Sequence, residues 1–145
     1  MTIARKTRVK SPSEPTGARI LLRSKIHRAT LTGKELDYEG SIALDRRLME
    51  AADLLAGEQV HVLNVSTGSR LITYVIEAPA GSGTVMLNGP AARLGEVGDV
   101  VVILAYGHYE DVVARRLKPR IVHVDAKNMP KSQSTSPQSA KKLGV

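Results

Sequence analysis

Several residue types are missing from this 145-residue sequence, and each absence excludes a class of chemistry. There is no cysteine, so disulfides, thiolate metal sites and thiol nucleophiles are excluded, and a reducing compartment is expected. Phenylalanine and tryptophan are also absent, and aromatic residues make up only 3% of the chain. A hydrophobic core must therefore be built from Val, Ile, Leu and Ala, which favours a compact β structure with short strands.

Long apolar runs are missing as well. The longest run, Val100 to Tyr106, is far too short to span a bilayer and predicts a buried strand. The N-terminal segment is polar and basic and contains Pro12 and Pro15, which is unlike a secretory signal. We therefore expect a cytoplasmic protein with no membrane contact.

The net charge of +7 is concentrated at the two ends of the chain. Residues 1–19 and residues 126–145 each have a net charge of +4, whereas residues 20–125 have a net charge of −1. A central region with few aromatic residues and no excess of basic residues argues against a nucleic-acid platform. Basic tails can still attract polyanions weakly. A non-catalytic small barrel that binds nucleic acid or protein through these tails is therefore one alternative for the function.

Composition also divides the chain into three parts. Residues 1–18 are rich in Lys, Arg, Ser, Thr and Pro, and residues 126–145 are rich in Lys, Ser and Pro, so both predict disordered basic extensions. The chain length predicts one domain, over residues 19–125.

Within this domain the sequence predicts a mainly β fold with one clear helix. The helix is predicted from Asp45, which can cap it, to Leu55, and Gly57 is expected to end it. A short helix is also predicted after Asn88, with Pro90 at its first position. Thr32-Gly33 is predicted to form a turn. Strands are predicted at residues 19–24, 25–32, 60–65, 70–78, 84–87, 100–106 and 120–125.

Many short strands with so little helix predict a small closed barrel. A weak internal repeat points the same way. The segments Gly57 to Leu63 and Gly98 to Leu104 share a glycine, an acidic residue and an apolar run. Such paired segments favour a pseudo-symmetric barrel.

The stretch Tyr38-Glu39-Gly40-Ser41 offers a specific chemistry. Gly40 has no Cβ, so its backbone can adopt strained or left-handed conformations. The Ser41 hydroxyl is within reach of the preceding carbonyl carbon, and its attack would convert the amide into an ester. Elimination and hydrolysis would then leave a pyruvoyl group, which can form an imine with an amino acid and accept electrons as carbon dioxide leaves. Taken alone, Gly-Ser is a common turn dipeptide.

Three further blocks accompany this stretch in order: Lys25 to Thr30, Asn64 to Tyr74, and Asn88 to Arg93. Together the four blocks resemble the aspartate 1-decarboxylases, self-cleaving pyruvoyl enzymes that make β-alanine for pantothenate synthesis. The resemblance covers about Ile20 to Asp125.

The resemblance implies a six-stranded double-psi β-barrel with one or two short helices. It also implies a homotetramer with sites between subunits, and L-aspartate as the substrate. Cleavage between Gly40 and Ser41 would give a fragment of residues 1–40 and a fragment of residues 41–145. The cofactor would be the pyruvoyl group made from Ser41, with no metal; the four scattered histidines likewise predict no metal site.

Two residues on one predicted strand carry much of the expected site. Arg70 and Tyr74 are four residues apart, so both point to the same face, and an arginine can hold a carboxylate through two hydrogen bonds. The resemblance implies that Tyr74 donates a proton to the α-carbon. It also implies that Thr73 contacts the substrate and assists cleavage, although Thr73 should point to the opposite face of the strand. Ordinary strand packing is the alternative for Thr73 and Tyr74.

The remaining expected site residues lie in the other blocks. The resemblance implies that Lys25 binds a carboxylate and that His27 and Tyr38 lie near the pyruvoyl group. A solvated lysine and a structural histidine are the alternatives. The two cationic side chains, Lys25 and Arg70, favour an acidic substrate, but they do not distinguish aspartate from glutamate.

Asn88 starts a segment that the resemblance places in cleavage and substrate binding. The resemblance implies that the backbone of Gly89, Pro90 and Ala91 contacts the substrate. Pro90 stands where the family usually has alanine, and it has no N–H to donate. A helix start without a ligand is the alternative.

Overall fold

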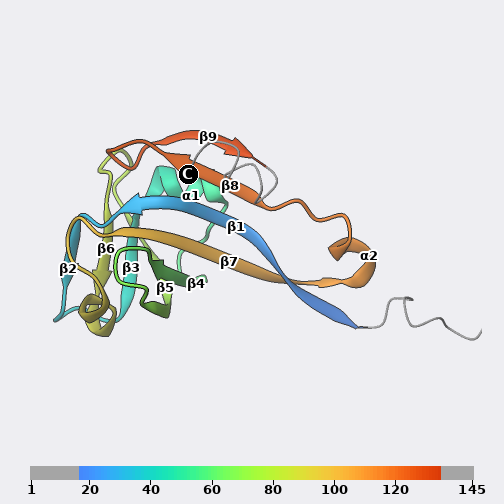
Figure 1. Ribbon diagram of the computed structural model, residues 1–145, viewed down its shortest axis with the longest axis horizontal. Helices are drawn as coiled ribbons and strands as arrows, with labels where there is room; N and C mark the ends of the chain where they lie inside the picture. Colours follow the sequence, from blue (N-terminus) through green and yellow to red (C-terminus); the bar gives the residue numbers. More distant parts are fainter. Residues whose placement is uncertain (1–16, 135–145) are drawn as a thin grey trace, which may run out of the picture.

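The computed structural model describes residues 17–134, and these form a β structure curled around one core (Figure 1). The expected mainly β barrel with short helices is confirmed. The elements, in chain order, are β1 (Ala18–Thr30), β2 (Gly33–Glu35), β3 (Ser41–Asp45), α1 (Arg46–Ala52), β4 (Gln59–Asn64), β5 (Arg70–Ala78), β6 (Val85–Asn88), the 3-10 helix η2 (Gly89–Leu94), β7 (Val100–Glu110), α2 (Asp111–Ala114), β8 (Arg120–Val124) and β9 (Pro130–Ser134).

The strand pairing is symmetrical about its centre. The strands lie in the order β2-β6-β3-β5-β4-β7-β1-β8-β9. The antiparallel pair β4–β7 is flanked on each side by an antiparallel pair, a parallel pair and a further antiparallel pair. The repeated segments around Gly57 and Gly98 lead into β4 and β7, so the expected pseudo-symmetry of a double-psi barrel is present. The centre of this pattern consists of six strands, in the spatial order β3-β5-β4-β7-β1-β8, and β2, β6 and β9 extend it.

Aliphatic side chains from both halves fill the core, as the lack of Phe and Trp requires. Fully enclosed residues come from every central strand, among them Ile26, Ile42, Val60, Val62, Val75, Val101, Ile103 and Val122. Burial of a side chain of this size contributes roughly 1.5–3 kcal/mol. The core therefore fixes the strands that carry the candidate site.

Helix α1 is shorter than predicted. Asp45 caps its start as expected, because its carboxylate accepts a hydrogen bond from the Arg47 amide at 2.7 Å. The helix ends at Ala52, because Asp53 takes up a left-handed conformation with φ of 56°. Gly57 is left-handed too, but it lies in the following turn and does not end the helix.

Other expectations need correction as well. The first predicted pair of strands is one continuous strand, β1, and Gly33 begins β2 where a turn was predicted. The segment Ser41–Asp45, to which no strand was assigned, forms β3. Residues 126–134 are ordered: β9 pairs with β8, and Asn128 is buried. Ala18, in the predicted N-terminal extension, already belongs to β1. The remaining parts of the predicted disordered ends, residues 1–16 and 135–145, lie outside the described residues.

Figure 1 shows β1 and β7 running side by side to α2, away from the shorter strands. Within residues 17–134, no helix is both long enough and apolar enough to cross a membrane.

Candidate active site

The Ser41 side chain is buried at the start of β3, directly after Gly40. Ser41 is 2% exposed. In the antiparallel pair β3–β6 it lies opposite Asn88, the last residue of β6. The hydroxyl accepts a hydrogen bond from Asn88 Nδ2 at 3.0 Å and donates one to the Glu39 carbonyl oxygen at 3.3 Å. The hydroxyl therefore turns back toward the segment that precedes it, and the Asn88 amide holds it there.

The left-handed glycine at this junction is Gly89, not Gly40. Gly89 has φ of +63°, whereas Gly40 is not among the described glycines with positive φ. A Cβ on Gly89 would lie 2.6 Å from the Tyr38 carbonyl oxygen and 2.6 Å from the Gly40 nitrogen, both backbone atoms. A Cβ on Gly40 would meet Pro90 Cδ at 3.3 Å. A side chain at Gly40 would thus press on the Pro90 ring, whereas Gly89 is required for both conformation and packing.

A pocket of about 360 Å³ opens beside Gly40. Its lining joins β5 to the start of η2 and consists of Gly40, Leu71, Ile72, Thr73, Tyr74, Pro90, Ala91 and Leu94. Five of the residues expected at the site, from three separate blocks of sequence, therefore surround one cavity.

The position of the pocket at a strand edge explains how two consecutive residues of β5, Thr73 and Tyr74, can both line it. Strand β3 pairs with β5 only from Val75 onward, and β4 covers the opposite edge of residues 70–74. The edge of Thr73 and Tyr74 next to Gly40 is therefore free of a strand partner. Side chains from both faces can reach a cavity at such an edge, so the predicted conflict over Thr73 needs no bulge, and the β4–β5 register is regular there.

The cationic residues expected at the site do not line this pocket. Arg70 lies at the exposed start of β5, on the same face as Tyr74, and Lys25 and His27 lie on β1. Within residues 17–134 neither Arg70 nor Lys25 forms an ion pair. Tyr38 is 59% exposed, and only its carbonyl oxygen is shown to approach the site, at Gly89.

The environment of β1 favours uncharged side chains. Burial lowers the pKa of Lys25. Burial, followed by the charge of Lys25 and the proximity of His123 and Arg28, lowers the pKa of His27 to about 4. The His27 and His123 rings meet edge to face at 5.8 Å, and neither His27 ring nitrogen has a hydrogen-bond partner among residues 17–134. His27 is therefore neutral at pH 7.

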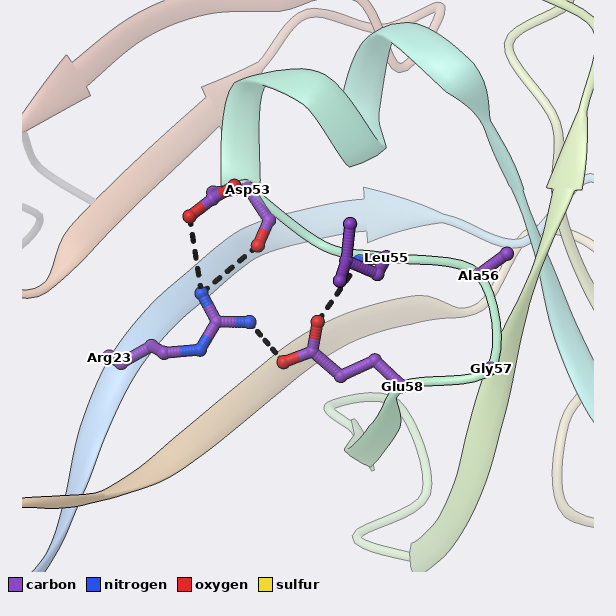
Figure 2. A pocket seen from close by; sticks show the side chains of 6 residues that line it. All are labelled: Arg23, Asp53, Leu55, Ala56, Gly57 and Glu58. Atoms are coloured by element: carbon purple, nitrogen blue, oxygen red, sulfur yellow. Dashed lines mark hydrogen bonds and ion pairs between the residues drawn. The ribbon is translucent and has the colours of Figure 1, made fainter.

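A larger hollow of about 620 Å³ lies elsewhere, between β1 and the turn after α1 (Figure 2). Figure 2 shows Arg23 directed at Asp53 and Glu58. The guanidinium binds the Glu58 carboxylate and donates to the Asp53 carbonyl oxygen at 3.0 Å. Because its cation is already paired, this hollow offers no free charge for an acidic substrate.

Sequence reasoning missed the apolar walls of the Gly40 pocket. Leu71, Ile72 and Leu94 lie next to predicted site residues, but they read as ordinary packing residues. In the sequence, alternation places Ile72 on the same strand face as Arg70 and Tyr74, and this was the available signal. In the structure Ile72 is 62% exposed. No group of three or more histidine and acidic side chains that could hold a metal occurs within residues 17–134.

Comparison with known proteins assigns the chain to a family. The aspartate decarboxylase family matches residues 18–131. Aspartate 1-decarboxylase 1 of Gloeobacter violaceus is 58% identical over 110 residues, which cover 76% of this chain and 93% of that protein. Aspartate 1-decarboxylase of Thermoanaerobacter pseudethanolicus is 48% identical over 112 residues, which cover 77% and 96%. Aspartate 1-decarboxylase of Dehalococcoides mccartyi is 56% identical over 108 residues, which cover 74% and 87%.

Proposed function

Because this chain belongs to the aspartate decarboxylase family, we propose that its pyruvoyl group arises from Ser41, by self-cleavage of the Gly40–Ser41 bond. The reaction of the enzyme is the α-decarboxylation of L-aspartate to β-alanine and carbon dioxide, which supplies pantothenate biosynthesis. The pyruvoyl group supplies a carbonyl that accepts electrons as carbon dioxide leaves.

One observation carries the proposal: the buried Ser41 hydroxyl is hydrogen-bonded to both Asn88 and the Glu39 carbonyl oxygen, beside a pocket. In the first step, a bond forms between Ser41 Oγ and the Gly40 carbonyl carbon. The bond from that carbon to the Ser41 nitrogen breaks, and the hydroxyl proton passes to this nitrogen. Loss of the Cα proton of residue 41 and breakage of its Cβ–Oγ bond would then release the Gly40 carboxylate and leave a dehydroalanine. Water would replace the nitrogen of this residue, which leaves as ammonia, and the pyruvoyl carbonyl would remain.

The residues around Ser41 suit such a step. Asn88 fixes the oxygen that attacks. Its own Oδ1 is buried and has no hydrogen-bond partner in the described part of the chain, so an acceptor is free beside Ser41. Thr73 lines the pocket with Gly40, and in this proposal its hydroxyl stabilises the Gly40 carbonyl oxygen as it becomes charged.

For the decarboxylation itself, we assign Tyr74 as the donor that returns a proton to the α-carbon. Its ring lines the pocket and is 37% exposed, so a substrate can reach it. The amides of Gly89 and Ala91 are the proposed donors to a substrate carboxylate, and Pro90 can contribute only its ring and carbonyl oxygen.

Lys25, His27 and Arg70 complete the proposed site through assembly. They do not line the pocket within one chain, and the exposed Ile72 and Leu94 beside it are available for contact with a second copy. A homotetramer with sites between subunits would bring Lys25 of one chain to the pocket of another. A cytoplasmic location also belongs to this proposal.

Denaturing mass spectrometry of the purified protein tests the cleavage. We expect fragments of residues 1–40 and 41–145, the latter with a carbonyl-reactive first residue. Ser41→Ala should remain a single chain without decarboxylase activity, whereas Ser69→Ala, in the turn before β5, should be cut normally. An active Ser41→Ala variant, or an uncut native chain, contradicts the proposal.

A further inference from the structure

The start of η2 is packed directly against the segment that ends at Gly40. At Gly89 the contact is between two stretches of backbone. A Cβ on Gly89 would lie within 2.7 Å of the Gly40 nitrogen, the Gly40 Cα and the Tyr38 carbonyl oxygen. On the Pro90 side the contact is made by a ring, whose Cδ lies 3.3 Å from the position of a Cβ on Gly40.

Three consecutive residues therefore touch successive parts of one junction. Asn88 donates to the Ser41 hydroxyl, Gly89 lies against the backbone of residues 38–40, and Pro90 covers Gly40. All three lie at the join of β6 and η2, and Asn88 and Ser41 are paired in the sheet. The attacking oxygen and the acyl carbon of Gly40 are thus located by the same short segment.

Pro90 makes this segment stiff. Its ring fixes φ near −65° and removes the N–H, and Gly89 before it is held in a left-handed conformation by the tight contact. A glycine such as Gly40 is otherwise the most conformationally free residue in a chain. Without a rigid neighbour, its carbonyl group would sample orientations that Ser41 Oγ cannot attack.

We infer that Pro90 and Gly89 are positioning residues for self-cleavage, which hold the Gly40 carbonyl group against the Ser41 hydroxyl. The inference rests on the proposed cleavage at Gly40–Ser41. Pro90 acts on the acyl group of the chain itself, a role separate from any contact with aspartate. Restricting two reacting groups to one geometry is a large source of rate acceleration, and misplacement by about 1 Å can lower a rate by roughly 100-fold.

The test compares the rate at which the uncut chain disappears in Pro90→Ala and in Pro79→Ala. Pro79 follows β5 at the Asp45 end of β3, far along the strand from Ser41. Freshly made uncut chain is incubated, and the uncut fraction is followed by denaturing mass spectrometry. We expect Pro90→Ala to be cut about tenfold more slowly, with a melting temperature close to that of the native chain, and Pro79→Ala to be cut at the native rate.

A double-mutant cycle separates positioning from general stability. Gly40→Ala introduces a methyl group against the Pro90 ring, so it should slow cleavage strongly. Adding Pro90→Ala should then speed cleavage of the Gly40→Ala chain, although Pro90→Ala alone slows it. Such a reversal of sign requires direct coupling between the two residues.

Three results would overturn the inference, and the first two are Pro90→Ala cut at the native rate, and effects of Gly40→Ala and Pro90→Ala on the rate that simply multiply. A melting temperature lowered in parallel with the cleavage rate would also overturn it, because the role would then be structural. A native chain that stays uncut has a different meaning, since it removes the cleavage on which the inference depends.

Discussion

At the scale of single residues, the proposed roles of Ser41 and Tyr74 fall on a buried and an accessible position. The Ser41 hydroxyl is enclosed and hydrogen-bonded, which suits an attack on its own chain that takes place once, before residue 41 becomes the pyruvoyl group. Tyr74 is partly exposed at the pocket, which suits a group that meets a substrate repeatedly. Substitutions at the two positions should therefore affect different steps.

We predict that Tyr74→Phe is cut normally but turns over poorly. The change removes only the phenolic hydroxyl, so the ring still packs at the pocket while the proton donor is lost. We expect kcat to fall about 100-fold or more. Tyr106→Phe, on β7 outside the pocket, is the control and should keep native kcat. A Tyr74→Phe enzyme with native turnover would remove Tyr74 from the proton-donor role.

His27 makes stability depend on pH. Its pKa is lowered from 6.5 to about 4 in the folded chain, by burial and by the neighbouring Lys25, His123 and Arg28. The unfolded chain thus binds a proton more readily, so stability is complete above about pH 6.5 and falls as the pH drops from 6.5 toward 4.

Replacement of His27 by Gln should weaken this dependence. We expect the difference in melting temperature between pH 7.5 and pH 5, measured by calorimetry, to be smaller in His27→Gln than in the native chain. His108→Gln, on the outer part of β7, provides a comparison that should keep the native pH dependence. An unchanged slope in His27→Gln would show that other groups control acid stability.

At the scale of elements, β3 links the candidate site to a polar network at its other end. Ser41 begins the strand and Asp45 ends it. The Asp45 carboxylate accepts hydrogen bonds from the amides of Arg47, Gly81 and Gly83 at 2.7, 3.1 and 2.7 Å. This network joins α1 to the turn before β6, so it sets the register of β6 against β3 and with it the contact between Asn88 and Ser41.

We predict that Asp45→Asn lowers the free energy of unfolding by roughly 1–3 kcal/mol at pH 7. Burial of Asp45 alone would raise its pKa, but the amides of Gly83, Arg47 and Gly81 outweigh burial and lower it. The stabilisation is therefore present above about pH 4 and is lost as the pH falls through the lowered pKa. Denaturant unfolding should show the native and Asp45→Asn curves converging below about pH 4; a constant difference would contradict this account.

The elements that local sequence could not predict depend on distant partners. β9 follows a polar segment with little to bury, and it is ordered because Asn128 bonds to the Thr30 backbone and to the Gly83 carbonyl oxygen. The pocket likewise depends on where the pairing of β3 with β5 begins, which no local pattern encodes. By contrast, β5 and the Asp45 cap follow from alternation and capping, and both were predicted. Three of the four motif blocks predicted residues around Gly40, but not that Gly89 lies against its backbone. The block Lys25 to Thr30 lies on β1, outside the pocket.

At the scale of the whole molecule, the proposed site draws on groups that one chain holds apart. Thr73 and Tyr74 line the pocket, whereas Lys25 lies on β1 and does not. If subunits share their sites, two different defects in two chains can be combined into one intact site.

Complementation between subunits tests this arrangement. Lys25→Ala and Tyr74→Phe chains should each be nearly inactive alone. Produced together, they should form mixed tetramers in which about a quarter of the sites have both native residues. Decarboxylase activity well above that of either variant is expected, and activity equal to the average of the two would place Lys25 and Tyr74 in the same subunit's site. Sedimentation of the mixture tests whether the chains form the proposed tetramer.

The location of β1 has a further consequence for the mature enzyme. This strand lies between β7 and β8, and β2 pairs with β6. Both described strands of the fragment that would end at Gly40 therefore pair with strands of the fragment that would begin at Ser41. A break in the backbone would leave every one of these ladders in place. The two polypeptides would therefore co-elute in chromatography under non-denaturing conditions, and the shorter one would dissociate only when the whole barrel is unfolded.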